Sequence, residues 1–167
     1  MLIYKTFFRQ NGGKGFVKKS YSILNNLPRK RSTITITIIS ASKLHTLLLD
    51  RTQSIDPCVV VDLYDFDPKA PDIDGKSQSR STGFVKNNGW NPAWTRDNEL
   101  TFTNVCIETA FVVIKAKDKE LKKDEDIGRV VIPLAAARQG YRTVNLETKT
   151  GIRTDGSQIL LKYEVFE

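Results

Sequence analysis

Residues 32–40 read Ser-Thr-Ile-Thr-Ile-Thr-Ile-Ile-Ser, an almost strict alternation of hydroxyl-bearing and branched apolar side chains. In an extended strand, successive side chains point to opposite faces of the sheet. Ile34, Ile36 and Ile38 would then share one face and the threonines the other. The pattern therefore predicts a β-strand with one face turned toward a core.

Further segments have the same β-strand character, being short, rich in β-branched or aromatic residues and separated by turn-forming residues. We expect strands at 58–66, 82–86, 99–103, 110–116, 127–134, 141–146 and 158–166. The most continuously apolar of them, 110–116, is expected at the centre of a sheet. Residues 67–79 contain two prolines, three aspartates and a glycine, and are predicted to form a long polar loop.

Eight short strands with turn signals about every 8–15 residues, and one helical turn at 135–139, are typical of an all-β fold. We predict an eight-stranded antiparallel β-sandwich. In such a fold the loops gather at the two ends, where functional residues are usually found.

The corner between 80 and 94 contains both tryptophans of the chain, Trp90 and Trp94. An Asn87-Asn88-Gly89 turn lies between them and the preceding predicted strand, and Asn-Gly supplies the positive backbone angle of a tight turn. Two interpretations remain open. The corner either presents carbonyl oxygens to a cation, or is a turn held firmly in place by an aromatic residue.

Charge limits the classes of partner. The chain has 26 basic and 19 acidic residues, a net charge of +7 and an isoelectric point near 9.4. This surplus favours anionic partners such as acidic lipid headgroups. Nucleic acid is not expected, because neither a recognition helix nor an aromatic RNA-binding sheet motif is found.

Cysteine and histidine limit the chemistry. Cys58 and Cys106 each lie in an apolar run, which predicts buried thiols in a reducing compartment. No apolar run approaches the roughly 20 residues of a membrane span. His45 is the only histidine and has no evident acid–base partner, so we assign no catalytic residue.

Acidic residues are concentrated in loops at 49–57 and 118–126, and with the turn at 87–92 these loops could converge at one end of a sandwich. The acids are Asp50, Asp56, Asp118, Glu120, Asp124, Glu125 and Asp126. Calcium takes roughly six to eight oxygen ligands, often from flexible loops. The alternative is that these are solvated acids, neutralised locally by Lys117, Lys119, Lys122 and Lys123.

Three of these stretches resemble C2 domains. Asp56-Pro57-Cys58-Val59-Val60-Val61 is similar to the start of that family's second strand, 88–94 to its second-loop motif, and Asp126-Ile127-Gly128 to the end of its third loop. Two further stretches resemble the C2 domain of one enzyme family in particular, phosphoinositide-specific phospholipase C. They are Ile132-Pro133-Leu134 and Gln139-Gly140-Tyr141-Arg142. Residues 11–19, Asn-Gly-Gly-Lys-Gly-Phe-Val-Lys-Lys, resemble the stretch that closes the catalytic barrel of that family.

The resemblance implies that residues 1–27 are the tail of the catalytic barrel (Y region) with a linker, and that 28–167 form a C2 domain of Greek-key topology. The cluster Pro28-Arg29-Lys30-Arg31 at the boundary is expected to be a solvated linker rather than a lipid-binding site. The implied function is membrane targeting: the module would bind acidic phospholipid, with or without Ca²⁺, and orient a barrel that hydrolyses phosphatidylinositol 4,5-bisphosphate to inositol trisphosphate and diacylglycerol. The implied location is cytoplasmic, at the inner face of the membrane. The alternative is a calcium-independent structural C2 domain that only packs on the barrel.

The resemblance also implies a ligand set for Ca²⁺. Asp56 matches the first-loop ligand, Asp50 lies six residues earlier at a position that many C2 domains use, and Asn88 falls where a second-loop amide can contribute. The third loop aligns in two ways, with either Ala116 and Asp118 or Asp118 and Glu120 as the paired positions. The final acid is Asp124 or Glu125. If Ala116 takes a ligand position, one carboxylate is lost and the affinity falls.

Lipid contact does not depend on calcium alone. Lys119, Leu121, Lys122 and Lys123 form a predicted docking tip on the third loop. Each lysine near an anionic leaflet contributes about 1 kcal/mol, screened by salt.

Overall fold

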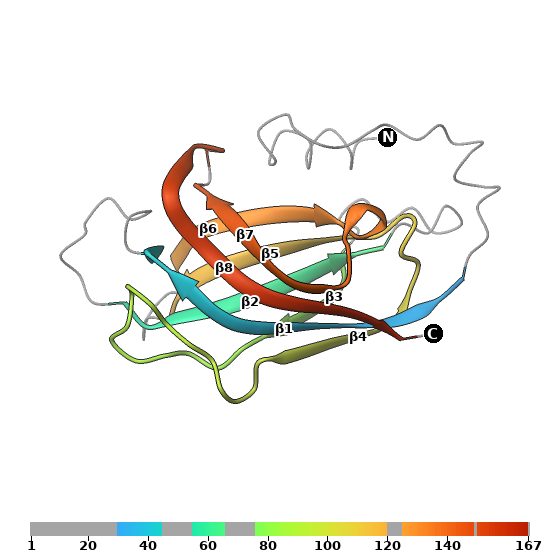
Figure 1. Ribbon diagram of the computed structural model, residues 1–167, viewed down its shortest axis with the longest axis horizontal. Helices are drawn as coiled ribbons and strands as arrows, with labels where there is room; N and C mark the ends of the chain where they lie inside the picture. The colour runs from blue at the N-terminus through green and yellow to red at the C-terminus, as the bar shows by residue number, and fades with distance from the viewer. Residues whose placement is uncertain (1–29, 45–54, 66–75, 120–124, 149, 167) are drawn as a thin grey trace.

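The computed structural model describes residues 30–44, 55–65, 76–119, 125–148 and 150–166. These residues form eight strands and one short 3-10 turn (Figure 1). The strands are β1 Ser32–Ser42, β2 Pro57–Tyr64, β3 Lys76–Ser81, β4 Glu99–Val105, β5 Phe111–Asp118, β6 Glu125–Pro133, β7 Gly140–Glu147 and β8 Arg153–Phe166, with η2 Leu134–Ala136 between β6 and β7. Residues 1–27, the predicted barrel tail, lie outside the described residues.

The strands pair in the order β3-β2-β5-β6-β7-β8-β1-β4, and every pairing is antiparallel. Between β6 and β7 the ladder is reduced to one pair, Arg129 with Glu147. The sheet folds over at this seam, so that β3-β2-β5-β6 and β7-β8-β1-β4 form the two layers of a sandwich. The predicted eight-stranded antiparallel sandwich is confirmed, and β5 is an interior strand, as expected from its apolar sequence.

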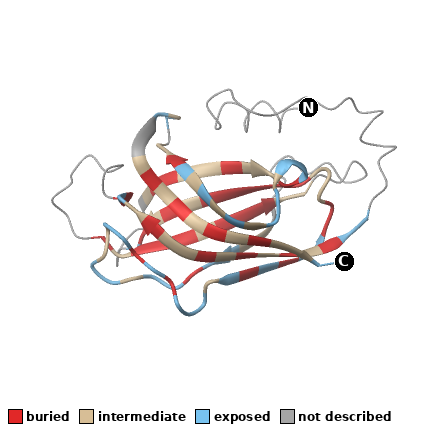
Figure 2. Cartoon of the chain, in the orientation of Figure 1, coloured by how far each residue is buried: buried red, intermediate tan, exposed pale blue. Residues whose placement is uncertain are grey.

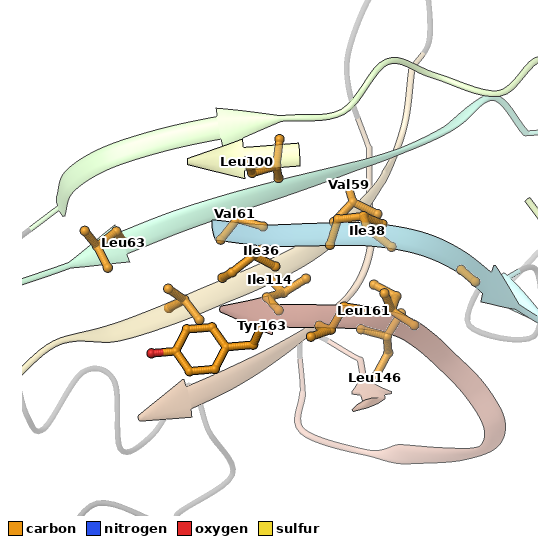
Figure 3. Close-up of a cluster of buried hydrophobic side chains, with 14 of the residues drawn as sticks. Ile36, Ile38, Val59, Val61, Leu63, Leu100, Ile114, Leu146, Leu161 and Tyr163 are labelled. Atoms are coloured by element: carbon orange, nitrogen blue, oxygen red, sulfur yellow. The ribbon is translucent and has the colours of Figure 1, made fainter. Parts of the chain in front are cut away.

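The core lies between the two layers. Burial alternates along β1, where Ile34, Ile36 and Ile38 are buried and the intervening threonines are only half-buried (Figure 2). Leu161 of the adjacent strand β8 and Ile114 of β5, in the opposite layer, meet these isoleucines (Figure 3). Each such aliphatic side chain contributes about 1.5–3 kcal/mol when fully buried. The alternation seen in the sequence therefore corresponds to the main source of stability.

A second apolar cluster explains why β5 is apolar on both faces. Phe111 and Val113 point away from the main core and are buried with Val131 of β6. The ring of Tyr64 stacks on Phe111, with centroids 5.0 Å apart and an interplanar angle of 5°. An interior strand covered on both sides cannot show the alternation that β1 shows.

The predicted strand at 82–86 is wrong. The third strand is β3, Lys76–Ser81, so the last residues of the predicted polar loop are a strand instead. The sequence Lys-Ser-Gln-Ser-Arg-Ser carries no apolar periodicity because β3 is an edge strand, paired only with β2. Beyond Ser81 the chain still follows β2, with the N–H groups of Thr82 and Val85 donating to the carbonyls of Val59 and Pro57 at 2.9 and 3.0 Å. The Thr82 hydroxyl accepts from Val59 N at 3.0 Å, so a side chain replaces the ladder bond there.

The Gln78 side chain joins the open edges of the two layers. The Gln78 carboxamide of β3 donates to the Thr103 carbonyl of β4 at 2.6 Å and accepts from the Thr103 N–H at 3.3 Å. This two-way bond imitates the pairing of a neighbouring strand. It covers part of two edges that would otherwise expose unpaired backbone groups.

Candidate functional site

The two predicted acidic loops and the Asn-Gly turn meet at one end of the sandwich. Asp118 Oδ1, at the end of β5, accepts from Asp56 N at 2.8 Å. Asp56 Oδ1 in turn accepts from Asn87 N at 2.7 Å, and Asp56 O accepts from Lys119 N at 3.0 Å. We call the region made of Asp56, 86–91, Asp118 and Lys119 the loop end. The expected convergence of the three loops is confirmed for these residues.

Strand register explains why the two carboxylates are neighbours. Pro57, the first residue of β2, pairs with Asp118, the last residue of β5. Asp118 lies on the core side of β5 and is only 6% exposed. A buried carboxylate needs hydrogen bonds, and the Asp56 N–H supplies one. Both aspartates therefore hold the loops in shape in addition to carrying charge.

Asn88 does not point its amide at this pair. Its Oδ1 accepts from Asn91 N at 3.2 Å and its Nδ2 donates to Asn91 O at 3.4 Å, so the side chain closes its own turn. Asn88 N donates to Ile55 O at 3.1 Å and ties the turn to the first loop. The positive backbone angle falls on Asn87, with φ 51°, and not on Gly89 as the Asn-Gly signal suggested. Of the two interpretations of this corner, the contacts of Asn88 with described residues support a firmly held turn and not a cation ligand.

The two tryptophans have different roles. Trp94 is buried, and its Nε1 donates to Gly83 O at 2.8 Å, which pins the base of the corner as expected. Trp90 is 62% exposed at the loop end, although its carbonyl accepts from Lys43 N at 2.6 Å. The sequence analysis did not predict this difference in burial between the two tryptophans. The position of Trp90 directly after the Asn-Gly turn was the available signal that its ring lies at a loop tip.

Lysines at this end differ in their surroundings. Lys117 forms an ion pair with Asp126 at 3.5 Å, which supports local neutralisation for that acid. Lys86 and Lys119 are exposed beside the aspartate pair. The loop end therefore combines two carboxylates, two exposed lysines and an exposed indole.

Several predicted site residues lie outside the described part of the chain: Asp50, Glu120, Leu121, Asp124, Lys122 and Lys123. Glu125 is described by its backbone, which pairs with Asp118. Within the described residues, no group of three or more His, Cys, Asp or Glu side chains could hold a metal ion. The structure brings together Asp56 and Asp118, and the other acids remain predictions.

The fit to calcium is partial in the described residues. Calcium takes roughly six to eight oxygens. Here two aspartates meet, the Asp118 carboxylate bonding to the Asp56 N–H, and each engages only Oδ1 in hydrogen bonds to described residues. Ala116 lies two residues before Asp118 on the same face of β5, fully buried against the core. It offers no oxygen at that position. Any further carboxylates would have to come from 45–54 and 120–125.

The opposite end of β2 anchors the start of the domain. Arg31 forms an ion pair with Asp65 and donates to Asn104 O at 3.0 Å. Asp65 also accepts from Cys106 N at 3.1 Å and from the Thr109 hydroxyl at 3.2 Å. Arg31 is exposed, as predicted for a solvated linker, and it also pairs with an acid distant in sequence. Cys58 and Cys106 are buried and form no disulfide, as expected.

Comparison with known proteins agrees with this arrangement. The C2 domain family matches residues 32–148. The chain is 28% identical to human 1-phosphatidylinositol 4,5-bisphosphate phosphodiesterase delta-1 over 97% of its own length, and 32% identical to the delta-4 protein of Macaca fascicularis over 87%. It spans about a fifth of the length of these relatives, 22% and 18%.

Solved structures show the same fold. A C2 domain of plant Extended Synaptotagmin 1 superposes with a TM-score of 0.63 at 17% identity, covering 83% of this chain and 97% of that one. PLC21 of S. officinalis superposes with a TM-score of 0.59 at 23% identity, covering 81% of this chain and 16% of that one. In the described part of the chain, no helix has the length and apolar character needed to cross a bilayer.

Proposed function

Because this chain belongs to the C2 domain family, we propose that it is the membrane-targeting module of a phosphoinositide-specific phospholipase C. Its relatives are phosphodiesterases named for phosphatidylinositol 4,5-bisphosphate, and the similarity extends over nearly the whole chain. The module binds phospholipid and orients a catalytic barrel. That barrel hydrolyses phosphatidylinositol 4,5-bisphosphate to inositol trisphosphate and diacylglycerol.

The observation that carries this proposal is the composition of the loop end. Lys86 and Lys119 are exposed and are chain neighbours of Asn87 and Asp118, which bond to Asp56, and Trp90 is exposed in the same turn as Asn87. Lysines near an anionic leaflet add about 1 kcal/mol each, and indole rings favour the membrane–water interface. We propose acidic phospholipid as the ligand and the inner, anionic face of the membrane as the location.

We propose in addition that Ca²⁺ strengthens binding without being required for it. Asp56 and Asp118 would hold the ion, with oxygens contributed by Asp50, Glu120, Asp124 or Glu125. When bound, the ion would offset the acidic charge of the loop end and provide a contact for lipid phosphate. Because Ala116 supplies no carboxylate, we expect affinity in the weak range of about 10⁻⁴–10⁻³ M.

Sedimentation with phosphatidylserine vesicles tests both parts. Each sample is measured with calcium and then with chelator, at low and high salt. We expect binding under chelator that salt weakens, and tighter binding with calcium. No sedimentation under any condition would reject lipid targeting and favour the purely structural C2 domain.

The double variant Asp56→Asn with Asp118→Asn isolates the calcium component. Asparagine keeps an oxygen for the backbone N–H groups of Asp56 and Asn87 but removes the charge. We expect the variant to lose the response to calcium and to keep the chelator-resistant binding. A calcium response equal to that of the parent protein would show that these residues are not ligands. Asp97→Asn, an exposed loop substitution, serves as the control.

The catalytic barrel is proposed as the second partner of the module. One feature supports a contact beyond the loop end: the Arg31–Asp65 pair, which fixes the chain directly after the predicted linker. A separately expressed barrel should co-purify with this chain. Failure to co-purify would contradict this proposal.

A further inference from the structure

Five large hydrophobic side chains are exposed in the described part of the chain, and two of them lie on the short stretch 84–90. They are Phe84, which is 56% exposed, and Trp90, which is 62% exposed. The exposed Lys86 lies between them in the sequence. Single exposed apolar residues are common on soluble proteins, whereas two aromatic rings on either side of a lysine are typical of a binding surface.

Phe84 lies beside the loop end. The chain between β3 and β4 passes around the end of the sandwich at which β2 begins (Figure 1). Val85 N donates to the carbonyl of Pro57, the first residue of β2, at 3.0 Å. Pro57 pairs with Asp118, the last residue of β5. Phe84 is therefore held along the start of β2, close to the level at which the two aspartates meet.

Phe84 is exposed because its neighbour Val85 is turned inward. Val85 is packed against the main core. Successive side chains of an extended segment point to opposite sides, and Phe84 and Lys86, on either side of Val85, are both exposed. An aromatic ring and an ammonium group two residues apart suit the surface of an anionic bilayer, where a ring enters the interface and a cation stays among the phosphates.

The backbone is fixed on both sides of Phe84. Before it, Trp94 Nε1 donates to Gly83 O at 2.8 Å. After it, the bond from Val85 N to Pro57 O joins the chain to β2. The buried Trp94 thus supports the peptide that carries the Phe84 ring. A segment that is already ordered loses little conformational freedom on binding, so more of the gain from burying the ring appears as affinity.

We propose that Phe84 is a second apolar anchor for lipid, which enters an anionic phospholipid bilayer together with Trp90 while Lys86 contacts the headgroup phosphates. The inference rests on the proposed function and adds an orientation to it. The bilayer contacts the stretch 84–86, along the start of β2, in addition to the turn at 87–92. The stretch 84–86 belongs to none of the three loops in which the calcium and lipid ligands are predicted.

Sedimentation with vesicles of phosphatidylserine and phosphatidylcholine compares Phe84→Ser with Phe166→Ser. Phe166 is the matched control, because it is 51% exposed and pairs with Thr33 at the opposite end of the sandwich. We expect Phe84→Ser to weaken binding about five- to tenfold, the value of burying a half-exposed phenyl ring. The loss should be the same at low and high salt, because salt does not screen apolar burial. Phe166→Ser should bind like the parent protein.

Quenching by brominated acyl chains measures insertion of the ring directly. Phe84→Trp and Phe166→Trp are each made in a Trp90→Phe background, in which Trp94 supplies a constant signal from the core. Both are measured with enough vesicle to sediment all of the protein. We expect brominated phosphatidylcholine to quench the emission of the Phe84→Trp variant and not that of the Phe166→Trp variant.

The two measurements separate this inference from the proposed function. If the parent protein sediments with the vesicles, equal affinity of Phe84→Ser or an unquenched Phe84→Trp variant would overturn the role of Phe84 and leave lipid targeting intact. If the parent protein does not sediment under any condition, the proposed function and the anchor are both overturned. Since the quenching experiment uses a different substitution, it decides the question even if Phe84→Ser does not fold.

Discussion

At the scale of single residues, Asp118 shows how one side chain can have a structural and a functional role. Its carboxylate is nearly buried and orders the first loop through Asp56 N. We therefore expect Asp118→Ala to destabilise the domain by about 1–3 kcal/mol, because it leaves the part-buried Asp56 N–H unpaired. Asp118→Asn should cost much less. Urea unfolding of the two variants measures the difference, and equal losses would contradict the structural role.

Trp90 provides an intrinsic probe of the surface. Only two tryptophans are present, and Trp94 is already buried. We expect vesicles containing phosphatidylserine to shift the emission of the protein to shorter wavelength, because the Trp90 ring enters the lipid interface. Trp90→Phe should abolish the shift while leaving the melting temperature unchanged. A shift that persists in this variant would show that Trp90 stays in water.

Gly156 is required by its backbone conformation. Its φ is +96°, and a Cβ at this position would lie 2.9 Å from Lys43 Cδ. We expect Gly156→Ala to destabilise the domain by about 1–3 kcal/mol, as strained backbone positions do. Gly83→Ala is the control, since nothing lies within 4 Å of its Cβ position. Thermal unfolding compares the two, and equal melting temperatures would contradict this interpretation.

At the scale of elements, the sequence predicted the strands that carry an apolar pattern and missed β3, which carries none. The alternation in β1 located an interior face correctly, and the apolar run of β5 located an interior strand. β3 carries neither pattern, because its stability comes from backbone pairing with β2 and from the Gln78 side chain. Nothing in Lys-Ser-Gln-Ser-Arg-Ser indicates that pairing, which depends on residues distant in the chain.

The Gln78 bridge makes a prediction about the open edges. Gln78→Ala removes both bonds to Thr103, so β3 and β4 should separate more readily. We expect a loss of about 1–2 kcal/mol and a greater tendency to self-associate through the exposed edges. Gln158→Ala, on a strand paired on both sides, is the control. Unfolding and light scattering measure the two effects, and equal behaviour of both variants would exclude the bridge.

At the scale of the whole molecule, β2 separates two differently built ends. One end holds Asp56, Asp118 and Trp90, and the other holds the Arg31–Asp65 network that fixes the start of the domain. The charge of +7 indicated an anionic partner but not where it binds. Strand periodicity could not predict the contact between Asp56 and Asp118, which are 62 residues apart. The expected gathering of loops at one end of a sandwich suggested it, as did the family resemblance, and the register of β2 with β5 produces it.

Hydrogen exchange of the chain, with and without phosphatidylserine vesicles, tests directly whether the loop end is the membrane-binding surface. We predict slower exchange on vesicle binding for amides at 86–91 and at Lys119. Amides at 104–109, at the opposite end, should exchange as in the free protein. Slowed exchange confined to 104–109, with 86–91 and Lys119 unchanged, would contradict the proposed orientation on the membrane.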